Sequence, residues 1–288
     1  DRTKLEADLA IIGGGAAGIT LARAFAGSGV SVCLLESGGL EADPEVQSLY
    51  QGENAGINYS PSVTRLRFFG GSTNHWGGYC RPLDAIDFEQ RDWVPFSGWP
   101  ITVDELAPYY TQATDIVEIG SGRFDDLDYW QQVTGEKLPE FKTGRMRLQF
   151  VQFSPPTRFG SRYRSELATA ANIHILLNAN VTRISASENT RGVNRLAVRT
   201  LNGLRHNVTA RYYVLAAGGL ENARILLLSN DVVPAGLGNQ HDVVGRYFME
   251  HPHLSGFAEM VVADLQRLPP IMRQRVMAEG RYANAAFN

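Results

Sequence analysis

Short apolar runs separated by helix-like segments make up the first part of the chain. Residues 7–12 (A-D-L-A-I-I) and 30–35 (V-S-V-C-L-L) are nearly continuous apolar runs, which is typical of buried parallel strands. Between them, residues 19–26 have the periodicity of a helix that ends at Gly27. A strand, a helix and a strand within about 30 residues predict a right-handed parallel βαβ unit, and hence an α/β fold.

Further elements are predicted after a long interruption. Residues 38–63 are polar and rich in turn residues, so we expect a surface excursion there. Residues 102–118 predict a helix, because Thr102 and Glu105 have the spacing of a capping box ahead of an apolar face. Residues 120–160 show no clean period and predict irregular structure. The remaining predicted elements are helices over 161–171 and 221–229, strands over 173–177, 181–187 and 212–217, a hairpin of 195–200 with 207–210 around Asn202-Gly203, and a turn at Gly218-Gly219.

Composition narrows the class of protein without deciding its function. The 288 residues are 44% apolar and 20% charged, as expected of a globular protein with one or two domains. The formal net charge of −3 gives no electrostatic footprint for nucleic acid, and the apolar runs are too short to cross a bilayer. Cys33 and Cys80 lack metal or haem spacing, and we expect Cys33 to be a buried small hydrophobe. We therefore expect a soluble protein without a metal, cytoplasmic by default, with a periplasmic location and an oligomeric state left open.

A dinucleotide fingerprint stands between the first predicted strand and the first predicted helix. In the run G-G-G-A-A-G, Gly13 permits a tight turn, Gly15 lets the backbone approach a pyrophosphate, and Gly18 lets the helix pack closely on the strand. Glu36 ends the second strand, where it can accept hydrogen bonds from ribose hydroxyls and repel the 2′-phosphate of NADP. The plainer alternative is a glycine-rich turn of an unrelated α/β protein with Glu36 simply exposed. The cofactor-binding residues predicted here are Gly13, Gly15, Ala16, Ala17, Gly18, Glu36 and Ser37.

The fingerprint alone does not separate FAD from NAD, but later segments favour FAD. The strand around Val181 has the place of one that lays its backbone along the adenine in two-domain flavoproteins. The last predicted strand ends in A-A-G-G, which places small residues where a chain must pass close to a dinucleotide, although an ordinary strand-to-helix turn would look the same. A simple NAD dehydrogenase would continue with αβ units directly after Glu36. We therefore predict FAD, with contacts from Val181, Ala216, Ala217 and Gly218.

Six motifs in a fixed order resemble one flavoenzyme family. They are G-G-G-A-A-G, E-S-G, G-G-S-T-N-H-W-G-G, S-G-W-P-I-T-V-D-E-L-A-P-Y-Y, A-A-G-G-L-E-N-A-R-I-L-L and G-R-Y-F-M-E-H-P-H. With them the chain resembles the glucose–methanol–choline (GMC) oxidoreductases, which oxidise sugars and alcohols, and looks most similar to the bacterial sugar-oxidising branch and the pyranose oxidases. The resemblance implies a two-domain, Rossmann-like FAD-binding fold plus part of a substrate-binding domain. It also implies that His251 and His253 belong to a structural motif rather than to a metal site.

The resemblance places a second glycine-rich loop along the isoalloxazine ring. Backbone N–H groups of such a loop and the Asn74 side chain can bond the polar edge of the ring and tune the reduced flavin. His75 falls where some family members attach FAD covalently and others do not, so the motif leaves covalent attachment, or a histidine that packs beside the flavin, both open. The residues implied are Gly70, Gly71, Ser72, Thr73, Asn74, His75, Trp76, Gly77 and Gly78.

The implied reaction is oxidation of a hydroxyl group of a sugar, glycoside or related alcohol by hydride transfer to flavin N5. Electrons then pass to oxygen or to an external acceptor. The family's catalytic histidine lies near the C-terminus of longer chains, and no residue here matches it, so the catalytic residues are unknown and we expect a fragment of a longer enzyme. The alternatives are an NAD-linked dehydrogenase and a non-catalytic dinucleotide-fold protein that binds a partner. The predicted division of the chain is residues 1–40 (βαβ), 41–160 (flavin-contacting loop and excursion), 161–250 (FAD-binding domain continued) and 251–288 (start of an incomplete substrate-binding domain).

Overall fold

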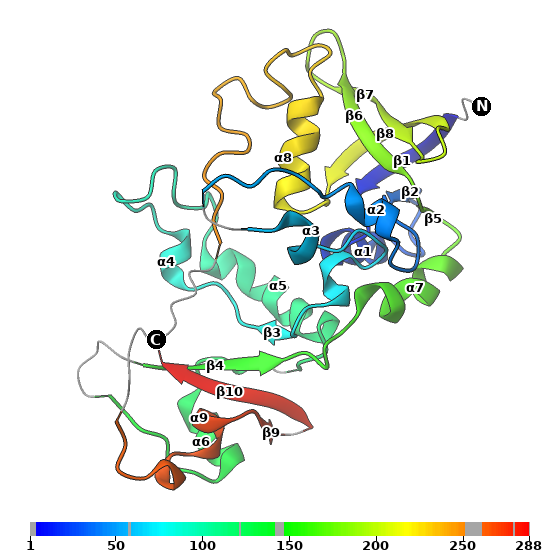
Figure 1. Ribbon diagram of the computed structural model, residues 1–288. Coiled ribbons are helices and arrows are strands. Elements are labelled where there is room, and N and C mark those ends of the chain that lie inside the picture. Colours follow the sequence, from blue (N-terminus) through cyan, green and yellow to red (C-terminus); the bar gives the residue numbers. More distant parts are fainter. Residues whose placement is uncertain are drawn as a thin grey trace. The chain divides into compact units, whose positions relative to one another are not determined.

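The chain is organised in two compact units (Figure 1). The computed structural model describes residues 4–56, 59–120, 122–141, 147–250, 261–278 and 280–287. The first unit comprises Asp1–His75 and Arg158–Pro252, and the second comprises Trp76–Thr157 and His253–Asn288. The four-part division expected from the sequence stays a prediction.

A six-stranded sheet with the order β5-β2-β1-β8-β7-β6 forms the centre of the first unit (Figure 1). Strands β5, β2, β1 and β8 run parallel, whereas β7 pairs antiparallel with both β8 and β6. The α/β fold with a parallel sheet is therefore confirmed. The strands are β1 (Lys4–Ile12), β2 (Val32–Leu35), β5 (Ile173–Leu176), β6 (Asn180–Ala186), β7 (Val193–Arg199) and β8 (Arg205–Leu215).

Burial of the apolar runs explains why the strands lie where they do. All four residues of β2 are buried, in agreement with the continuous apolar run of the sequence. One side of the sheet packs a cluster that includes Ala10, Leu35, Leu196 and Val208, together with Ile225 of helix α8 (Gly219–Leu228). The other helices of this unit are α1 (Ala16–Ala24), α2 (Pro44–Ser48), α3 (Pro61–Thr64), η1 (Gly71–Asn74, a 3-10 helix) and α7 (Phe159–Thr169).

Strand β8 is one long element where the sequence predicts two. Its pairing with β1 is unbroken from Lys4 opposite Asn207 to Ile12 opposite Leu215, apart from the position of Asp8. The sequence predicts strand segments over 207–210 and 212–217, which leaves Arg211 between them. Strand β1 pairs with β8 on both sides of Arg211, and β8 runs through this position as one strand. The predicted hairpin around Asn202-Gly203 is confirmed, since Thr200 N donates to Leu204 O and Gly203 has a φ of +88°.

A four-stranded antiparallel sheet with the order β3-β4-β10-β9 forms the second unit. Its helix α5 begins after Thr102, whose side chain forms the predicted capping box with Glu105. The elements are β3 (Tyr79–Cys80), α4 (Ala85–Phe88), α5 (Val103–Ile116), α6 (Leu127–Thr134), β4 (Leu148–Phe153), η2 (Leu265–Arg267), α9 (Pro270–Arg273), β9 (Val276–Ala278) and β10 (Arg281–Phe287).

The prediction of irregular structure over residues 120–160 is wrong. Helix α6 and strand β4 lie in that stretch, and Trp130 of α6 stacks on Phe150 of β4 with ring centroids 5.4 Å apart. Both residues belong to a core with Leu138 and Ile271. Because these short elements are stabilised by that core and not by their own periodicity, the sequence pattern alone did not reveal them.

Membrane-spanning helices and metal-binding clusters are both missing from the described residues. None of the helices found there has the length and apolar character needed to span a membrane. In the same part of the chain, no three His, Cys, Asp or Glu side chains gather in a way that could hold a metal ion. His251 and His253 lie outside the described residues.

We expect Cys33 to resist thiol reagents as long as the protein is folded. Burial in β2 raises the pKa of the Cys33 thiol to about 11, so little thiolate forms at mildly alkaline pH. Labelling with Ellman's reagent, followed by mass spectrometry of peptides, should show Cys33 modified only after denaturation. The half-buried Cys80, whose pKa burial also raises, serves as the internal comparison. Fast labelling of Cys33 in the native protein would contradict this prediction.

Candidate cofactor site

A cavity of about 540 Å³ lies in the first unit, where β1, β2 and β8 end and α1 and α8 begin. Its wall brings together residues predicted from five separate stretches of sequence. The predicted residues that line it are Gly13, Gly15, Ala16, Ala17, Glu36, Ser37, Gly71, Ser72, Thr73, Val181, Ala216, Ala217 and Gly218.

The other predicted residues do not form the wall of this cavity. Gly18 is buried within the first turn of α1, and Gly70 precedes η1. Asn74 ends η1, and His75 follows it with an exposed side chain. Trp76, Gly77 and Gly78 belong to the second unit. Contacts of these residues with a flavin therefore stay predictions.

The three fingerprint glycines have three different environments. A Cβ atom on Gly13, whose φ is +110°, would lie 2.5 Å from the carbonyl oxygen of Ala216. A Cβ on Gly18 would lie 1.9 Å from the carbonyl oxygen of Gly13, which is why helix and turn can approach so closely. A Cβ on Gly15 would meet nothing within 4 Å, and Gly15 is the N-cap of α1. The turn thus leaves open space at the helix N-terminus, where backbone N–H groups attract phosphate.

Glu36, which directly follows β2, stabilises this turn through two hydrogen bonds. Its side chain is 6% exposed, and its two oxygens accept hydrogen bonds from Gly14 N and Gly38 N, each at 2.8 Å. Burial raises the pKa of Glu36, against the opposing effects of those two N–H donors and of the Arg67 charge. A carboxylate has about four acceptor positions, so two bonds leave capacity for ribose hydroxyls.

We expect Glu36→Gln to destabilise the protein by about 1–3 kcal/mol, because the amide turns an NH₂ group toward one of two buried N–H donors. Urea denaturation followed by circular dichroism measures this free energy of unfolding. Glu41→Gln, at an exposed position of the adjoining excursion, is the matched control and should change little. Equal stability of the two variants would show that the contacts to Gly14 and Gly38 contribute nothing.

The second glycine-rich loop lies directly on the first. Gly70 N donates to Gly14 O at 2.7 Å, and a Cβ on Gly71 would lie 3.2 Å from the Cα of Gly15. Asn74 holds the loop together, since its amide nitrogen donates to the carbonyl oxygens of Phe69 and Gly71 at 3.1 and 3.0 Å. The close approach of the two loops leaves little room for a side chain at Gly71.

Sequence reasoning missed a polar cluster in the wall of the same cavity. Tyr50, Arg65, Arg67 and Glu221 line it, and none of them was predicted. Arg65 and Arg67 shortly precede the second loop, and Glu221 stands in the run A-A-G-G-L-E-N. Both segments were therefore next to residues already predicted to contact the cofactor. Their meeting was not visible, because the ion pair of Arg65 with Glu221 joins residues 156 positions apart. The prediction of a surface excursion is correspondingly incomplete, since Tyr50 from that stretch reaches the cavity and Val46 is buried.

Comparison with known proteins decides the family. A family model described as FAD dependent oxidoreductase (DAO) matches residues 8–236. The chain belongs to the FAD dependent oxidoreductase family. This membership confirms FAD as the cofactor, and it overturns the NAD-linked alternative for the dinucleotide site.

Individual relatives and solved structures match most of the chain at low identity. It is 25% identical over 305 residues to the 2-methyl-1,2-propanediol dehydrogenase of Mycolicibacterium austroafricanum, an alignment covering 85% of the chain and 55% of that protein. It is 22% identical over 321 residues to the fructose dehydrogenase large subunit of Gluconobacter japonicus, covering 86% and 59%. A crystal structure of formate oxidase shares the fold, with a TM-score of 0.54, 21% identity and coverage of 80% of this chain and 48% of that one. The chain thus spans about half the length of these proteins.

Proposed function

We propose that this chain is the FAD-binding portion of a GMC-type oxidoreductase that oxidises a hydroxyl group of a sugar, glycoside or related alcohol. The observation that carries the proposal is the single cavity lined by fingerprint, Glu36, second-loop and A-A-G-G residues together. The six ordered sequence motifs support the GMC branch. The names of the two curated relatives, a diol dehydrogenase and a fructose dehydrogenase subunit, support a polyol or sugar substrate.

The residues present fit FAD. The open space at Gly15 suits a pyrophosphate at the start of α1, and Glu36 offers acceptors for ribose hydroxyls. Ser37 and Val181 would border the adenosine end, and the second loop the flavin end. When bound, FAD supplies the acceptor for the hydride that leaves the carbinol carbon. The base that takes the hydroxyl proton has no candidate among the described residues, and the final electron acceptor is oxygen or an external molecule.

Anaerobic titration of the full-length protein tests this function. Purified protein should show the visible absorbance of a flavin, and addition of fructose or a vicinal diol should bleach it, because the substrate's two electrons enter the flavin. Flavin that no sugar or alcohol reduces would favour the non-catalytic partner-binding alternative. Protein that neither retains nor binds FAD would overturn the proposal.

Denaturation of the purified protein tests whether FAD is covalently attached to His75. We expect the yellow colour to leave the protein on acid precipitation, because the His75 side chain is exposed and lies beyond the loop residues that line the cavity. The measurement is the flavin absorbance of the washed pellet and of the supernatant. A pellet that stays yellow in the wild type and loses its colour in His75→Ala would instead establish a covalent bond.

A further inference from the structure

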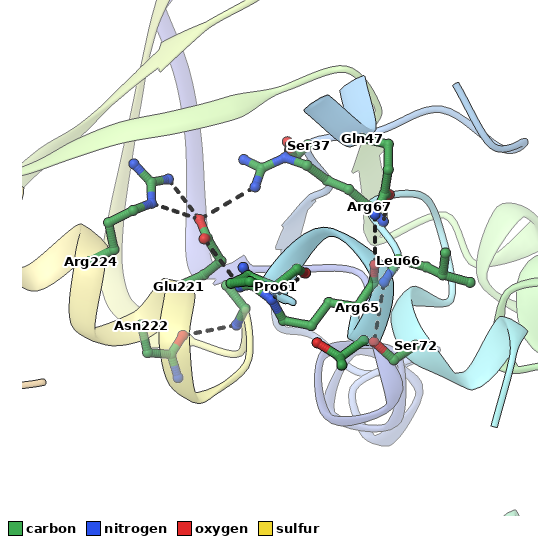
Figure 2. Close-up of polar contacts among 12 residues, drawn as sticks. Ser37, Gln47, Pro61, Arg65, Leu66, Arg67, Ser72, Glu221, Asn222 and Arg224 are labelled. Atoms are coloured by element: carbon green, nitrogen blue, oxygen red, sulfur yellow. Dashed lines mark hydrogen bonds and ion pairs between the residues drawn. The ribbon is translucent and has the colours of Figure 1, made fainter. Parts of the chain in front are cut away.

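Glu221 is a buried carboxylate in the cavity wall that none of the roles above uses. It lies in the first turn of α8, two residues after the A-A-G-G run, and is 5% exposed. Three arginines surround it (Figure 2). Arg65 and Arg67 reach it at 3.2 and 3.3 Å, and Arg224 at 2.7 Å.

Arg67 connects Glu221 to both strands at the predicted adenosine end. Its Nε donates to Ser37 Oγ at 2.6 Å, just after β2, and one terminal nitrogen lies 3.5 Å from Asn180 Oδ1 at the start of β6. Ser37 Oγ in turn donates to Asn180 Oδ1 at 2.5 Å. The Arg67 side chain is only 8% exposed. Its guanidinium is therefore buried, and its planar set of N–H donors contacts Glu221 of α8, Ser37 just after β2 and Asn180 of β6.

Arg65 connects Glu221 to the excursion. Its guanidinium carbon lies 3.9 Å from the ring centroid of Tyr50, and that of Arg67 lies 4.7 Å from the same centroid. The Tyr50 ring is itself part of the cavity wall. Burial raises the pKa of Tyr50, so the phenol is neutral at physiological pH. Arg65 Nε also donates to Pro61 O at 3.2 Å, in α3. Glu221 therefore lies behind two arginines that also contact Ser37, Asn180 and Tyr50.

The charge of Glu221 is matched to these arginines. Burial alone would raise the pKa of Glu221, but Arg224, Arg67 and Arg65 outweigh burial and hold the pKa below its usual value. Removing the charge would leave the buried Arg67 without its carboxylate partner. Loss of one partner of a buried ion pair lowers the stability of the fold strongly, because the remaining charge is uncompensated.

We propose that Glu221 is a positioning residue for the adenosine half of the cofactor, an inference that rests on the proposed FAD site. Through Arg67 it sets the places of Ser37 and Asn180, and through Arg65 it sets the place of Tyr50. Glu221 itself does not have to touch the cofactor. The inference predicts a defect in binding the adenosine half that exceeds any general loss of stability.

ADP, which carries the adenosine and pyrophosphate of FAD, is the probe. Isothermal titration of apoprotein prepared from the full-length chain should give a dissociation constant for ADP that is about tenfold higher in Glu221→Gln than in the wild type. Glu221→Asp keeps the charge and should recover part of the affinity. The matched control is Glu166→Gln, which breaks the ion pair of Glu166 with Arg23 between α7 and α1 and should leave ADP affinity within about twofold.

Thermal unfolding of the apoproteins separates positioning from stability. A lower midpoint with unchanged ADP affinity in Glu221→Gln would overturn the inference, as would equal losses in the Gln and Asp variants. If Glu221→Gln does not fold, Arg67→Lys decides by the same comparison, because lysine keeps the charge and loses the fork. Failure of the wild type to bind both FAD and ADP would count against the proposed function instead.

Discussion

Gly15→Val is expected to weaken FAD binding by about 10- to 100-fold, while the apoprotein keeps its fold. Gly15 has extended backbone angles (φ −84°, ψ −167°) that valine adopts readily, and a Cβ at this position meets no protein atom within 4 Å. The new side chain therefore enters the cavity at the start of α1, where the pyrophosphate would approach. The substitution therefore weakens cofactor binding and leaves the free energy of unfolding nearly unchanged, apart from about 1 kcal/mol lost because valine is a poorer N-cap residue.

Two measurements on the purified variant check this expectation. Quenching of FAD fluorescence on binding gives the affinity, and urea denaturation of the apoprotein gives the free energy of unfolding. Gly29→Val is the matched control, because Gly29 is exposed, also has open space around its Cβ position and does not line the cavity. Wild-type affinity in Gly15→Val would show that no cofactor phosphate comes near this residue.

Gly18→Ala should have the opposite profile and destabilise the fold itself. The added methyl group would lie 1.9 Å from the carbonyl oxygen of Gly13 and 3.4 Å from Cγ2 of Ile11. The turn has little room to move away, because Gly13 N donates to Leu35 O at 2.8 Å and its Cα faces the backbone of Ala216. Overpacking of this kind costs about 1–3 kcal/mol and sometimes more, so we expect a loss of at least this size in the free energy of unfolding.

The same pair of measurements distinguishes the two glycine variants. In Gly18→Ala, the urea midpoint should fall and the purified protein should carry less flavin, because the distorted turn also forms the cavity wall. In Gly15→Val the midpoint stays and the affinity falls. A Gly18→Ala protein with wild-type stability would mean that helix α1 is free to shift away from the turn, which would contradict its close packing on β1.

Local features of the site could be predicted because their interactions span few residues. The Gly13–Gly18 contact lies within one strand–turn–helix junction, and the capping box of Thr102 and Glu105 spans one helical turn. The hairpin at Asn202-Gly203 is equally local. In each case the residue types at fixed spacing admit one favourable backbone conformation. Such signals need no knowledge of the rest of the fold.

Features that depend on distant partners were missed. The separate strands predicted around Arg211 are one strand because β1, about two hundred positions earlier in the chain, pairs with β8 on both sides of Arg211. Helix α6 and strand β4 gain their stability from a shared core around Trp130 and Phe150. Neither partner can be inferred from periodicity within a short window, since packing overrides weak local preference.

By itself the sequence determined the βαβ unit, the phosphate-binding turn and the choice of FAD, since these rest on short-range backbone geometry and residue size. The tertiary structure alone decided which residues close the cavity. Tyr50, Arg65, Arg67 and Glu221 come from an excursion, a loop and a helix that are far apart in sequence. The charges of Arg65, Arg67 and Glu221 are stable in a buried place only as a set, and such a set exists only when the fold has brought its members together.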